Sequence, residues 1–66
     1  MNENSGTYII VTWNNEKEIE DCLSTVSRYS PKNSKVIVVD NNSNDRTVQI
    51  IKEKFPETEL IESKEN

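Results

Sequence analysis

Apolar residues along this chain fall into short runs of two kinds, compact runs without charge and runs with helical spacing. The stretches YIIVT (residues 8–12) and KVIVVD (residues 35–40) are rich in β-branched residues, which predicts two strands. A third and weaker strand is predicted for TELIES, residues 58–63. Each strand is separated from the next by a longer segment that favours a helix.

The segment after the first predicted strand has the spacing of a helix. Its apolar residues recur at i, i+3, i+4 and i+7 and form one stripe: Ile19, Cys22, Leu23 and Val26. Asn15 followed by Glu18 resembles a capping box, so we expect Asn15 to be the N-cap. Pro31 disfavours helical backbone in the residue before it and ends the helix.

The segment RTVQIIKEKF, residues 46–55, predicts a second helix. Its apolar side is expected to carry Val48, Ile51 and Phe55. A polar residue before the segment is expected to cap it, and the candidates are Ser43, Asn44 and Asp45. Pro56 ends the helix.

The predicted order is therefore β-α-β-α-β, which indicates an α/β fold with a parallel sheet. Crossovers between parallel strands are right-handed, so a strand order of 3-2-1 places both helices on the same face of the sheet. Residues 1–6 are polar apart from Met1 and are expected to be loose.

Apolar residues on both faces of the predicted strands create a burial requirement. Ile9 and Val11 point to one face of the sheet, and Tyr8 and Ile10 point to the other. Such runs belong to parallel sheets covered on both sides, whereas two helices cover only one. The first strand is also an edge without Lys or Pro to protect it. We expect the chain to be a piece of a larger α/β domain, or to cover itself by self-association.

Composition narrows the function classes. The chain has 66 residues, one cysteine, no histidine and a net charge of −4. A lone cysteine forms no internal disulfide, missing histidine removes the commonest metal ligand, and scattered basic residues argue against nucleic-acid binding. No apolar run approaches the roughly 20 residues that span a bilayer, and MNENSG does not resemble a secretory signal. A cytoplasmic location is predicted.

Polar clusters follow the first two predicted strands, where a ligand would bind. Ligands of open parallel sheets bind outside the carboxyl ends of the strands. Those ends are TWNN (residues 12–15) and DNNSND (residues 40–45), and they are neighbours if the two strands pair. The helix N-termini behind both loops suit a phosphate.

Three related folds are rejected. A dinucleotide-binding Rossmann fold and a P-loop need a glycine-rich turn after the first strand, but the only glycine, Gly6, precedes that strand. A receiver-like signalling domain needs an acidic pocket after the first strand, which instead ends in Thr12-Trp13.

The segments YIIVTWNNEKEIEDCLSTV, VIVVDNNSNDRTVQII and LIESKEN together resemble the start of family 2 glycosyltransferases with the GT-A fold. Within that family, the resemblance is closest to the rhamnosyltransferase-like bacterial enzymes that build surface polysaccharides. It covers residues 8–66, and residues 7–66 would then be the N-terminal fragment of a GT-A domain, a partial Rossmann-like nucleotide-binding unit.

The resemblance implies a hexosyltransferase-type enzyme. It would move a sugar with inversion from a UDP- or dTDP-sugar to a saccharide or glycolipid acceptor. The full-length enzyme would use a divalent metal, Mg or Mn, held by a D-x-D motif beyond residue 66, where the catalytic base would also lie. No catalytic residue and no metal ligand is therefore expected in this chain, and the isolated chain is expected to be inactive. The full-length protein would lie in the cytoplasm at the inner face of the membrane, and a homo-oligomer is expected.

The resemblance also implies a set of nucleotide-binding residues: Thr12, Trp13, Asn14, Asp40, Asn42, Ser43 and Asp45. The acid at Asp40 would bind the base, and residues 12–14 would line the base and ribose.

Each of these residues has a structural alternative. Asp40 could be a turn acid, Asp45 and Ser43 could cap the following helix, and Trp13 could cover the sheet edge. Thr12 could reflect strand propensity alone. The alternative function is a non-catalytic α/β module that self-associates through its uncovered sheet.

Overall fold

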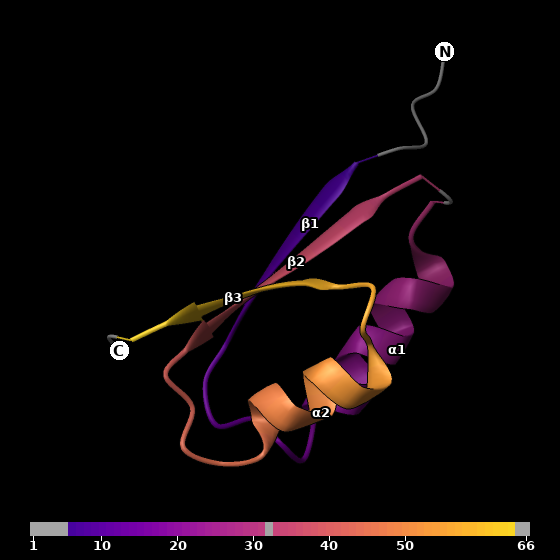
Figure 1. Ribbon diagram of the computed structural model, residues 1–66. Coiled ribbons are helices and arrows are strands. Elements are labelled where there is room, and N and C mark those ends of the chain that lie inside the picture. Colours follow the sequence, from indigo (N-terminus) through magenta and orange to yellow (C-terminus); the bar gives the residue numbers. More distant parts are fainter. Residues whose placement is uncertain (1–5, 32, 65–66) are drawn as a thin grey trace.

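The computed structural model describes residues 6–31 and 33–64. Its five elements follow the predicted order: β1 (Thr7–Thr12), α1 (Ile19–Tyr29), β2 (Lys35–Asn41), α2 (Thr47–Lys54) and β3 (Glu59–Ser63). The strands are parallel and lie in the order β1-β2-β3, which is the predicted order 3-2-1 seen from the other edge. Both helices lie on the same side of the sheet (Figure 1). The predicted α/β fold is confirmed.

The register of the sheet brings the strand ends together. Thr12 lies beside Asp40, and Asp40 lies beside Glu62. At the other end, the N–H of Lys35 donates to the carbonyl of Gly6 at 2.8 Å. Of the N-terminal segment predicted to be loose, residues 1–5 lie outside the described residues.

The core lies between the sheet and the two helices. Its buried members are Ile19 and Leu23 of α1, Val38 of β2 and Ile51 of α2. Half-buried apolar residues pack against them: Ile10, Val36, Ile50, Phe55 and Leu60. The apolar stripe predicted for α1 is confirmed, since its other two members are half-buried.

The apolar side of α2 differs in part from the prediction. Ile51 is buried and Phe55 packs against the core, but Ile50 takes the core position that was assigned to Val48. Thr47 at the start of the helix is completely buried. Its hydroxyl is hydrogen-bonded to Asp45 and to the N–H of Asn15, so this polar side chain can be buried.

The predicted capping box of α1 is wrong. The helix begins at Ile19 with Glu18 in the N-cap position and has no side-chain cap. Residues 16–18 form a turn instead, in which the carbonyl of Asn15 accepts the N–H groups of Glu18 at 3.0 Å and Ile19 at 2.8 Å. The N–H of Asn15 is hydrogen-bonded to the neighbouring loop, and the helix begins about one turn later than predicted. Ser30 is the C-cap, as the following Pro31 predicts.

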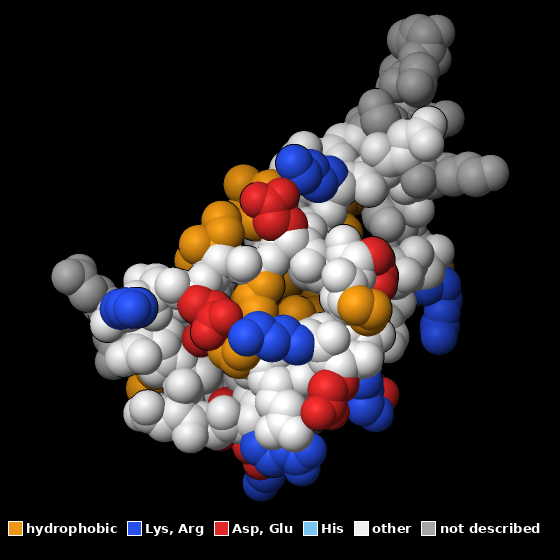
Figure 2. All heavy atoms as spheres, viewed as in Figure 1, with side chains coloured by type: hydrophobic (Ala, Val, Ile, Leu, Met, Phe, Trp, Pro, Cys, Tyr) orange, Lys and Arg blue, Asp and Glu red, His pale blue; other side chains and the backbone are white. Residues whose placement is uncertain are grey.

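The face of the sheet opposite the helices is uncovered in the described part of the chain. Ile9 is 66 % exposed, Val11 is 63 % exposed and Ile61 is 46 % exposed. Hydrophobic side chains gather along the side of the sheet turned away from α1 and α2 (Figure 2). Both faces of this parallel sheet are therefore apolar, but only one is packed, as the strand pattern predicts.

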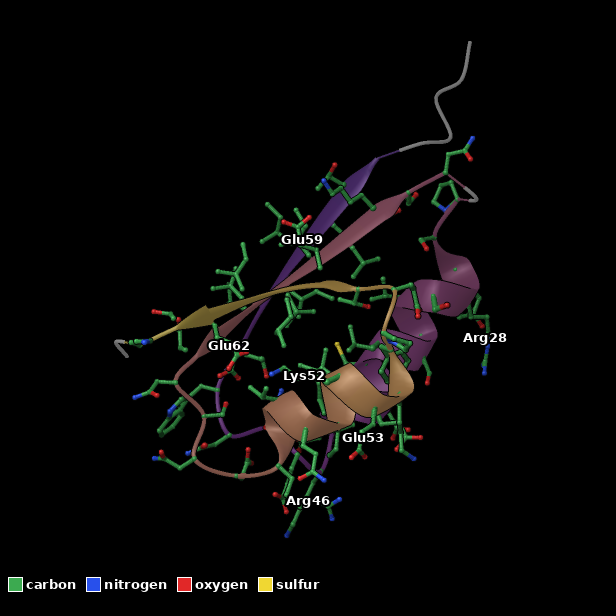
Figure 3. All side chains as sticks on the ribbon, viewed as in Figure 1. Arg28, Arg46, Lys52, Glu53, Glu59 and Glu62 are labelled. Carbon is green, nitrogen blue, oxygen red and sulfur yellow. The ribbon has the colours of Figure 1, made fainter. Side chains whose placement is uncertain are left out.

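Ion pairs lie on both faces of the sheet. Lys52 of α2 pairs with Glu62 at 3.2 Å, and Lys35 pairs with Glu59 at 3.3 Å. Figure 3 shows Lys52 and Glu62 between α2 and β3, and Glu59 on the opposite side of the sheet. These side chains are half-exposed or more, so each pair contributes under about 1 kcal/mol. The fold depends on the core rather than on these pairs.

Removing one methyl group from the core tests this assignment. Ile51→Val should lower the free energy of unfolding by about 1 kcal/mol, because the cavity it leaves is enclosed by packed side chains. The matched variant Ile9→Val removes the same group from a side chain that is 66 % exposed and should leave stability nearly unchanged. Urea unfolding followed by circular dichroism measures both. Equal losses in the two variants would show that the helix side of the sheet is not the core.

Candidate functional site

Two loops meet at the carboxyl edge of the sheet. Residues 13–18 follow β1 and residues 42–46 follow β2, and the pairing of these strands sets the loops side by side. The described structure joins them by hydrogen bonds that cross from one loop to the other, which makes the two loops one unit.

The first crossing runs through the hydroxyl of Ser43. Asp40, the last residue but one of β2, is only 2 % exposed, and both of its carboxylate oxygens accept hydrogen bonds from Ser43. The Ser43 hydroxyl donates to Oδ1 at 2.6 Å, and the Ser43 N–H donates to Oδ2 at 2.9 Å. The same hydroxyl accepts the N–H of Asn14 at 2.8 Å. We call this Asp40–Ser43–Asn14 chain the Ser43 relay.

The second crossing repeats this design one turn further along. Asp45 accepts the hydroxyl of Thr47 at 2.5 Å and the Thr47 N–H at 2.9 Å, both at Oδ1. The Thr47 hydroxyl accepts the N–H of Asn15 at 2.7 Å. We call this Asp45–Thr47–Asn15 chain the Thr47 relay. In each relay, a carboxylate fixes a hydroxyl group, and the hydroxyl fixes the loop after β1.

Reciprocal contacts reinforce the two relays. The N–H of Glu16 donates to Asp45 Oδ2 at 3.1 Å, and the Glu16 carboxylate accepts the N–H of Arg46 at 2.9 Å. The side chain of Asn14 accepts the N–H of Asn44 at 2.7 Å. Backbone donors of both loops thus find acceptors in the opposite loop, which is how irregular backbone satisfies its polar groups.

Two asparagines adopt the left-handed backbone conformation that these turns need. Asn14 has φ 48° and Asn42 has φ 64°. Asparagine tolerates this region better than other residues with a side chain. A chain whose single glycine lies elsewhere therefore makes both turns with asparagine.

Thr12, at the end of β1, lies next to Asp40 on the same face of the sheet. It is 3 % exposed, and its hydroxyl oxygen is buried without a hydrogen-bond partner. A buried polar group without a partner is unfavourable and is uncommon in folded proteins. Trp13, the next residue, is 53 % exposed, so its ring is not held in the described core.

The structure places the seven predicted residues at one edge of the sheet but gives them different environments. Asp40 and Thr12 are buried, Ser43 and Asp45 are half-buried, and Trp13, Asn14 and Asn42 are exposed. Asp45 accepts the N–H of Thr47, the first residue of α2, as a helix cap does, although Arg46 occupies the N-cap position. The side chain of Ser43 serves the relay rather than the helix N-terminus.

Three residues outside the predicted set also build this edge. Asn15 was predicted only as a cap, and neither Glu16 nor Thr47 was among the predicted site residues. For Thr47 the sequence did carry a signal, because it lies two residues after Asp45. An aspartate side chain often hydrogen-bonds to the backbone of the residue two positions further along the chain. No local pattern indicates the partners that Asn15 and Glu16 find about 30 residues away.

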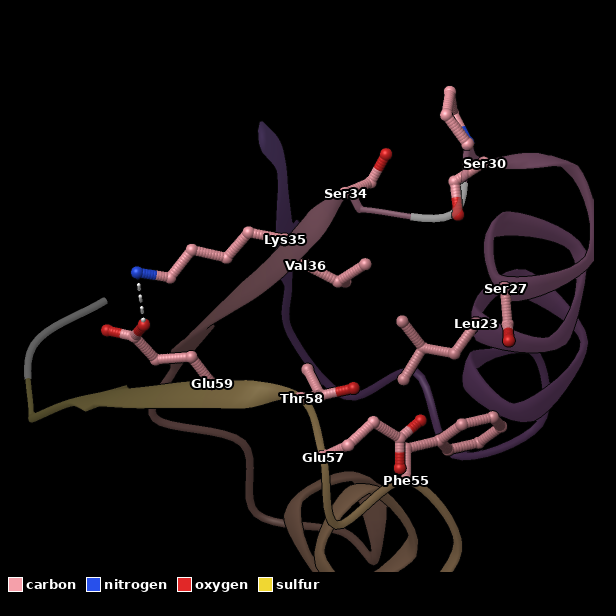
Figure 4. A pocket seen from close by; sticks show the side chains of 11 residues that line it. Leu23, Ser27, Ser30, Ser34, Lys35, Val36, Phe55, Glu57, Thr58 and Glu59 are labelled. Atoms are coloured by element: carbon pink, nitrogen blue, oxygen red, sulfur yellow. Dashed lines mark ion pairs between the residues drawn. The ribbon is translucent and has the colours of Figure 1, made fainter. Parts of the chain in front are cut away.

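Two depressions lie at opposite ends of the sheet. One of about 410 Å³ lies over the joined loops and is lined by Asn14, Glu16, Lys17, Glu18, Asn44 and Asp45. The other, of about 450 Å³, lies at the amino end of β2, between α1 and the turn before β3 (Figure 4). Its apolar floor includes Leu23, Val36 and Phe55. Only the first is formed by the joined loops, and neither Thr12 nor Asp40 lines it.

Among residues 6–31 and 33–64, no group of three or more carboxylate or cysteine side chains is arranged to hold a metal ion. These side chains therefore do not form a metal site by themselves. The described helices also include none that is long and apolar enough to cross a bilayer.

Comparison with known protein families gives a match over residues 7–66 to the family described as "Glycosyl transferase family 2". The chain belongs to glycosyl transferase family 2. This agrees with the resemblance seen in the sequence and with a three-stranded parallel unit of the GT-A or Rossmann-like type. No match was found among curated proteins or among solved structures.

The Thr47 relay affects the pKa of Asp45 in this family 2 chain. Partial burial acts to raise the pKa of Asp45, but hydrogen bonds from Thr47 and from the N–H of Glu16 outweigh it. The pKa of Asp45 therefore lies below its ordinary value of 3.8. The ionised carboxylate is the form that fastens the two loops.

The lowered pKa of Asp45 makes stability depend on acid pH. A carboxyl group whose pKa is lower in the folded state stabilises the fold at pH above its unfolded value, and this contribution is lost as pH falls through the folded value. Urea unfolding at pH 7 and pH 3 should show a loss of stability toward pH 3, and Asp45→Asn should reduce that loss. Asp21→Asn, at an exposed acid of α1, is the matched control. An equal pH dependence in wild type and Asp45→Asn would exclude this role.

Proposed function

We propose that this chain is the part of a family 2 glycosyltransferase that binds the nucleotide of the sugar donor. The donor would be a UDP- or dTDP-sugar, and the acceptor a saccharide or glycolipid. The full-length enzyme would be of the hexosyltransferase type, similar to rhamnosyltransferases of polysaccharide biosynthesis. It would work in the cytoplasm at the inner face of the membrane, with Mg or Mn held by residues that this chain does not supply.

One observation carries this proposal: a buried carboxylate and a buried hydroxyl without a partner end adjacent strands at the carboxyl edge of a parallel sheet. Asp40 can accept an N–H and Thr12 can pair with a carbonyl, so together they suit the edge of a nucleobase. This is also the edge where open parallel sheets bind ligands. Trp13 and Asn14, exposed beside them, are available for the base and the ribose.

The loops contribute rigidity to this proposed site. A binding group performs best when its position is fixed before the ligand arrives, since less ordering is then required on binding. The two relays fix the backbone of both loops relative to the strand ends. The role of Asp45 and Thr47 in this proposal is to position the loops, whereas Asp40, Thr12, Trp13 and Asn14 would face the nucleotide. Ser43 and Asn42 would shape the wall between them.

Titration of the ¹⁵N-labelled chain with UDP tests the proposal. We expect weak binding, in the millimolar range, with chemical-shift changes confined to residues 12–16 and 40–47, and no sugar transfer. Asp40→Ala should weaken binding by about 1–3 kcal/mol, the size of a lost hydrogen bond to a charged group. Asp21→Ala is the matched control, since this acid lies on the exposed side of α1. Shift changes elsewhere, or unchanged binding by a folded Asp40→Ala variant, would refute the assignment.

A second role is favoured by the uncovered face of the sheet. We infer that the 66-residue chain self-associates through Ile9, Val11 and Ile61, because removing their exposed apolar surface from water is favourable. Three strands about 4.8 Å apart and five residues long give a face of roughly 240 Å². This is small beside the ~800 Å² per partner of a stable interface, so a weak homo-oligomer is expected.

Sedimentation equilibrium at several concentrations tests the self-association. Wild-type chain should show a mass above that of the monomer at high concentration, and Ile9→Glu should return it to the monomer because a charge is then placed within the apolar face. Tyr29→Glu, at a side chain of α1 that is 75 % exposed, should leave the mass unchanged. A monomeric wild-type chain at the highest concentration would rule out this role.

A further inference from the structure

The outer edge of β1 carries backbone groups that no described strand pairs with. Of the described strands, only β2 pairs with β1, which lies at one edge of the sheet (Figure 1). The carbonyl of Gly6 accepts the N–H of Lys35, so the backbone of Gly6 points toward β2. The direction of the backbone groups alternates along a strand, and every second residue after Gly6 therefore also bonds to β2. The residues between them direct their N–H and carbonyl groups away from the sheet: Thr7, Ile9 and Val11.

The two edges of the sheet differ in charge. β3, at the other edge, carries Glu59 and Glu62, whose side chains are about half exposed. Charged side chains on an edge strand hinder pairing with a second copy of that strand, because like charges then face each other. β1 has neither a charged residue nor a proline from Thr7 to Thr12. Of the two edges, β1 is therefore the one open to a further strand.

A second copy of β1 matches this edge residue by residue. Most homo-oligomers have two-fold symmetry, and two copies of an edge strand that extend one sheet across such an axis are antiparallel. In an antiparallel pair, two opposite residues exchange both hydrogen bonds when the backbone of each points toward the other strand. All of the outward residues find such a partner when the axis passes through Ile9. Ile9 then faces Ile9 of the second copy, and Thr7 faces Val11 of the second copy.

The side chains of β1 agree with this register. Pairs of β-branched or aromatic residues across two strands stabilise an antiparallel sheet. On the open face, Ile9 would meet its own copy and Val11 would meet Thr7. On the helix side, Tyr8, which is 39 % exposed, would meet the half-buried Ile10. The pairing also joins the open faces of the two copies into one surface of twice the area.

We propose that two copies of this chain pair through the outer edges of β1, in antiparallel orientation and centred on Ile9, and so form one continuous sheet. This inference deepens the self-association role proposed above, because it names the contact that orients the two copies. The paired edge of six residues is about 20 Å long, which is short for an interface of the stable kind with ~800 Å² per partner. The dimer is therefore expected to dissociate on dilution.

Proline at the centre of the contact tests this pairing. Ile9→Pro removes an N–H that points away from β2, so the hydrogen bonds within the sheet of one copy remain. The dimer loses both hydrogen bonds between the two copies of Ile9, and its dissociation constant should rise at least about tenfold. Ile9→Thr is the matched control, because it keeps the N–H and a branched side chain and should weaken the dimer less. Sedimentation equilibrium measures each dissociation constant, and circular dichroism checks the fold.

Association through the open face alone gives a different set of results. It predicts similar losses for Ile9→Pro and Ile9→Thr, and a loss for Ile61→Thr, since Ile61 lies on that face but on β3. Edge pairing predicts that Ile61→Thr forms the dimer as the wild type does. A dimer that survives Ile9→Pro and is lost in Ile61→Thr would overturn the edge pairing and leave the open-face role standing. A wild-type chain that stays monomeric would overturn both.

Hydrogen exchange followed by NMR locates the contact without a mutation, and it decides the question if Ile9→Pro does not fold. At concentrations where the chain associates, the amides of Thr7, Ile9 and Val11 should exchange more slowly than in dilute solution, in proportion to the associated fraction. The amides of Tyr8 and Ile10 bond to β2 in each copy, so their exchange should not change. An exchange rate at Ile9 that is independent of concentration would overturn the inference.

Discussion

Hydrogen bonds through two hydroxyl groups hold this molecule together at its polar edge. Ser43 and Thr47 each donate to an aspartate of their own loop and accept an N–H from the loop after β1. Without these bonds, two irregular segments would present unpaired backbone groups over the ends of the strands. With them, the loops become a single surface whose position is set by the register of β1 and β2.

The open face of the sheet has a different requirement, because its apolar side chains are not covered. A core built from four buried apolar residues leaves the other face of the same strands without a covering in the described chain. The strands are therefore adapted to an environment with two packed layers, and the polar edge is the site that we propose for the nucleotide. Both features are compatible with membership of glycosyl transferase family 2, since parallel sheets are generally covered on both faces and bind ligands at the carboxyl ends of their strands.

Local patterns predicted most of the fold, and long-range contacts account for what they missed. Periodicity located the five elements and the buried stripe of α1 because these features depend on neighbouring residues, and the strand order was assigned from the alternation of strands and helices. The capping box at Asn15 failed because the backbone of that residue bonds instead to Thr47, 32 residues away. The strand ends Thr12 and Asp40 were predictable from topology, whereas the occupation of Asp40 by Ser43 required side-chain geometry. The family assignment itself came from the resemblance of the whole segment rather than from any one motif.

The most direct test of this account is a crystal structure of the chain grown with UMP. The account predicts the base at the ends of β1 and β2, in contact with Asp40 and Thr12, and the Thr47 relay intact. A nucleotide seated away from the ends of β1 and β2 would contradict it.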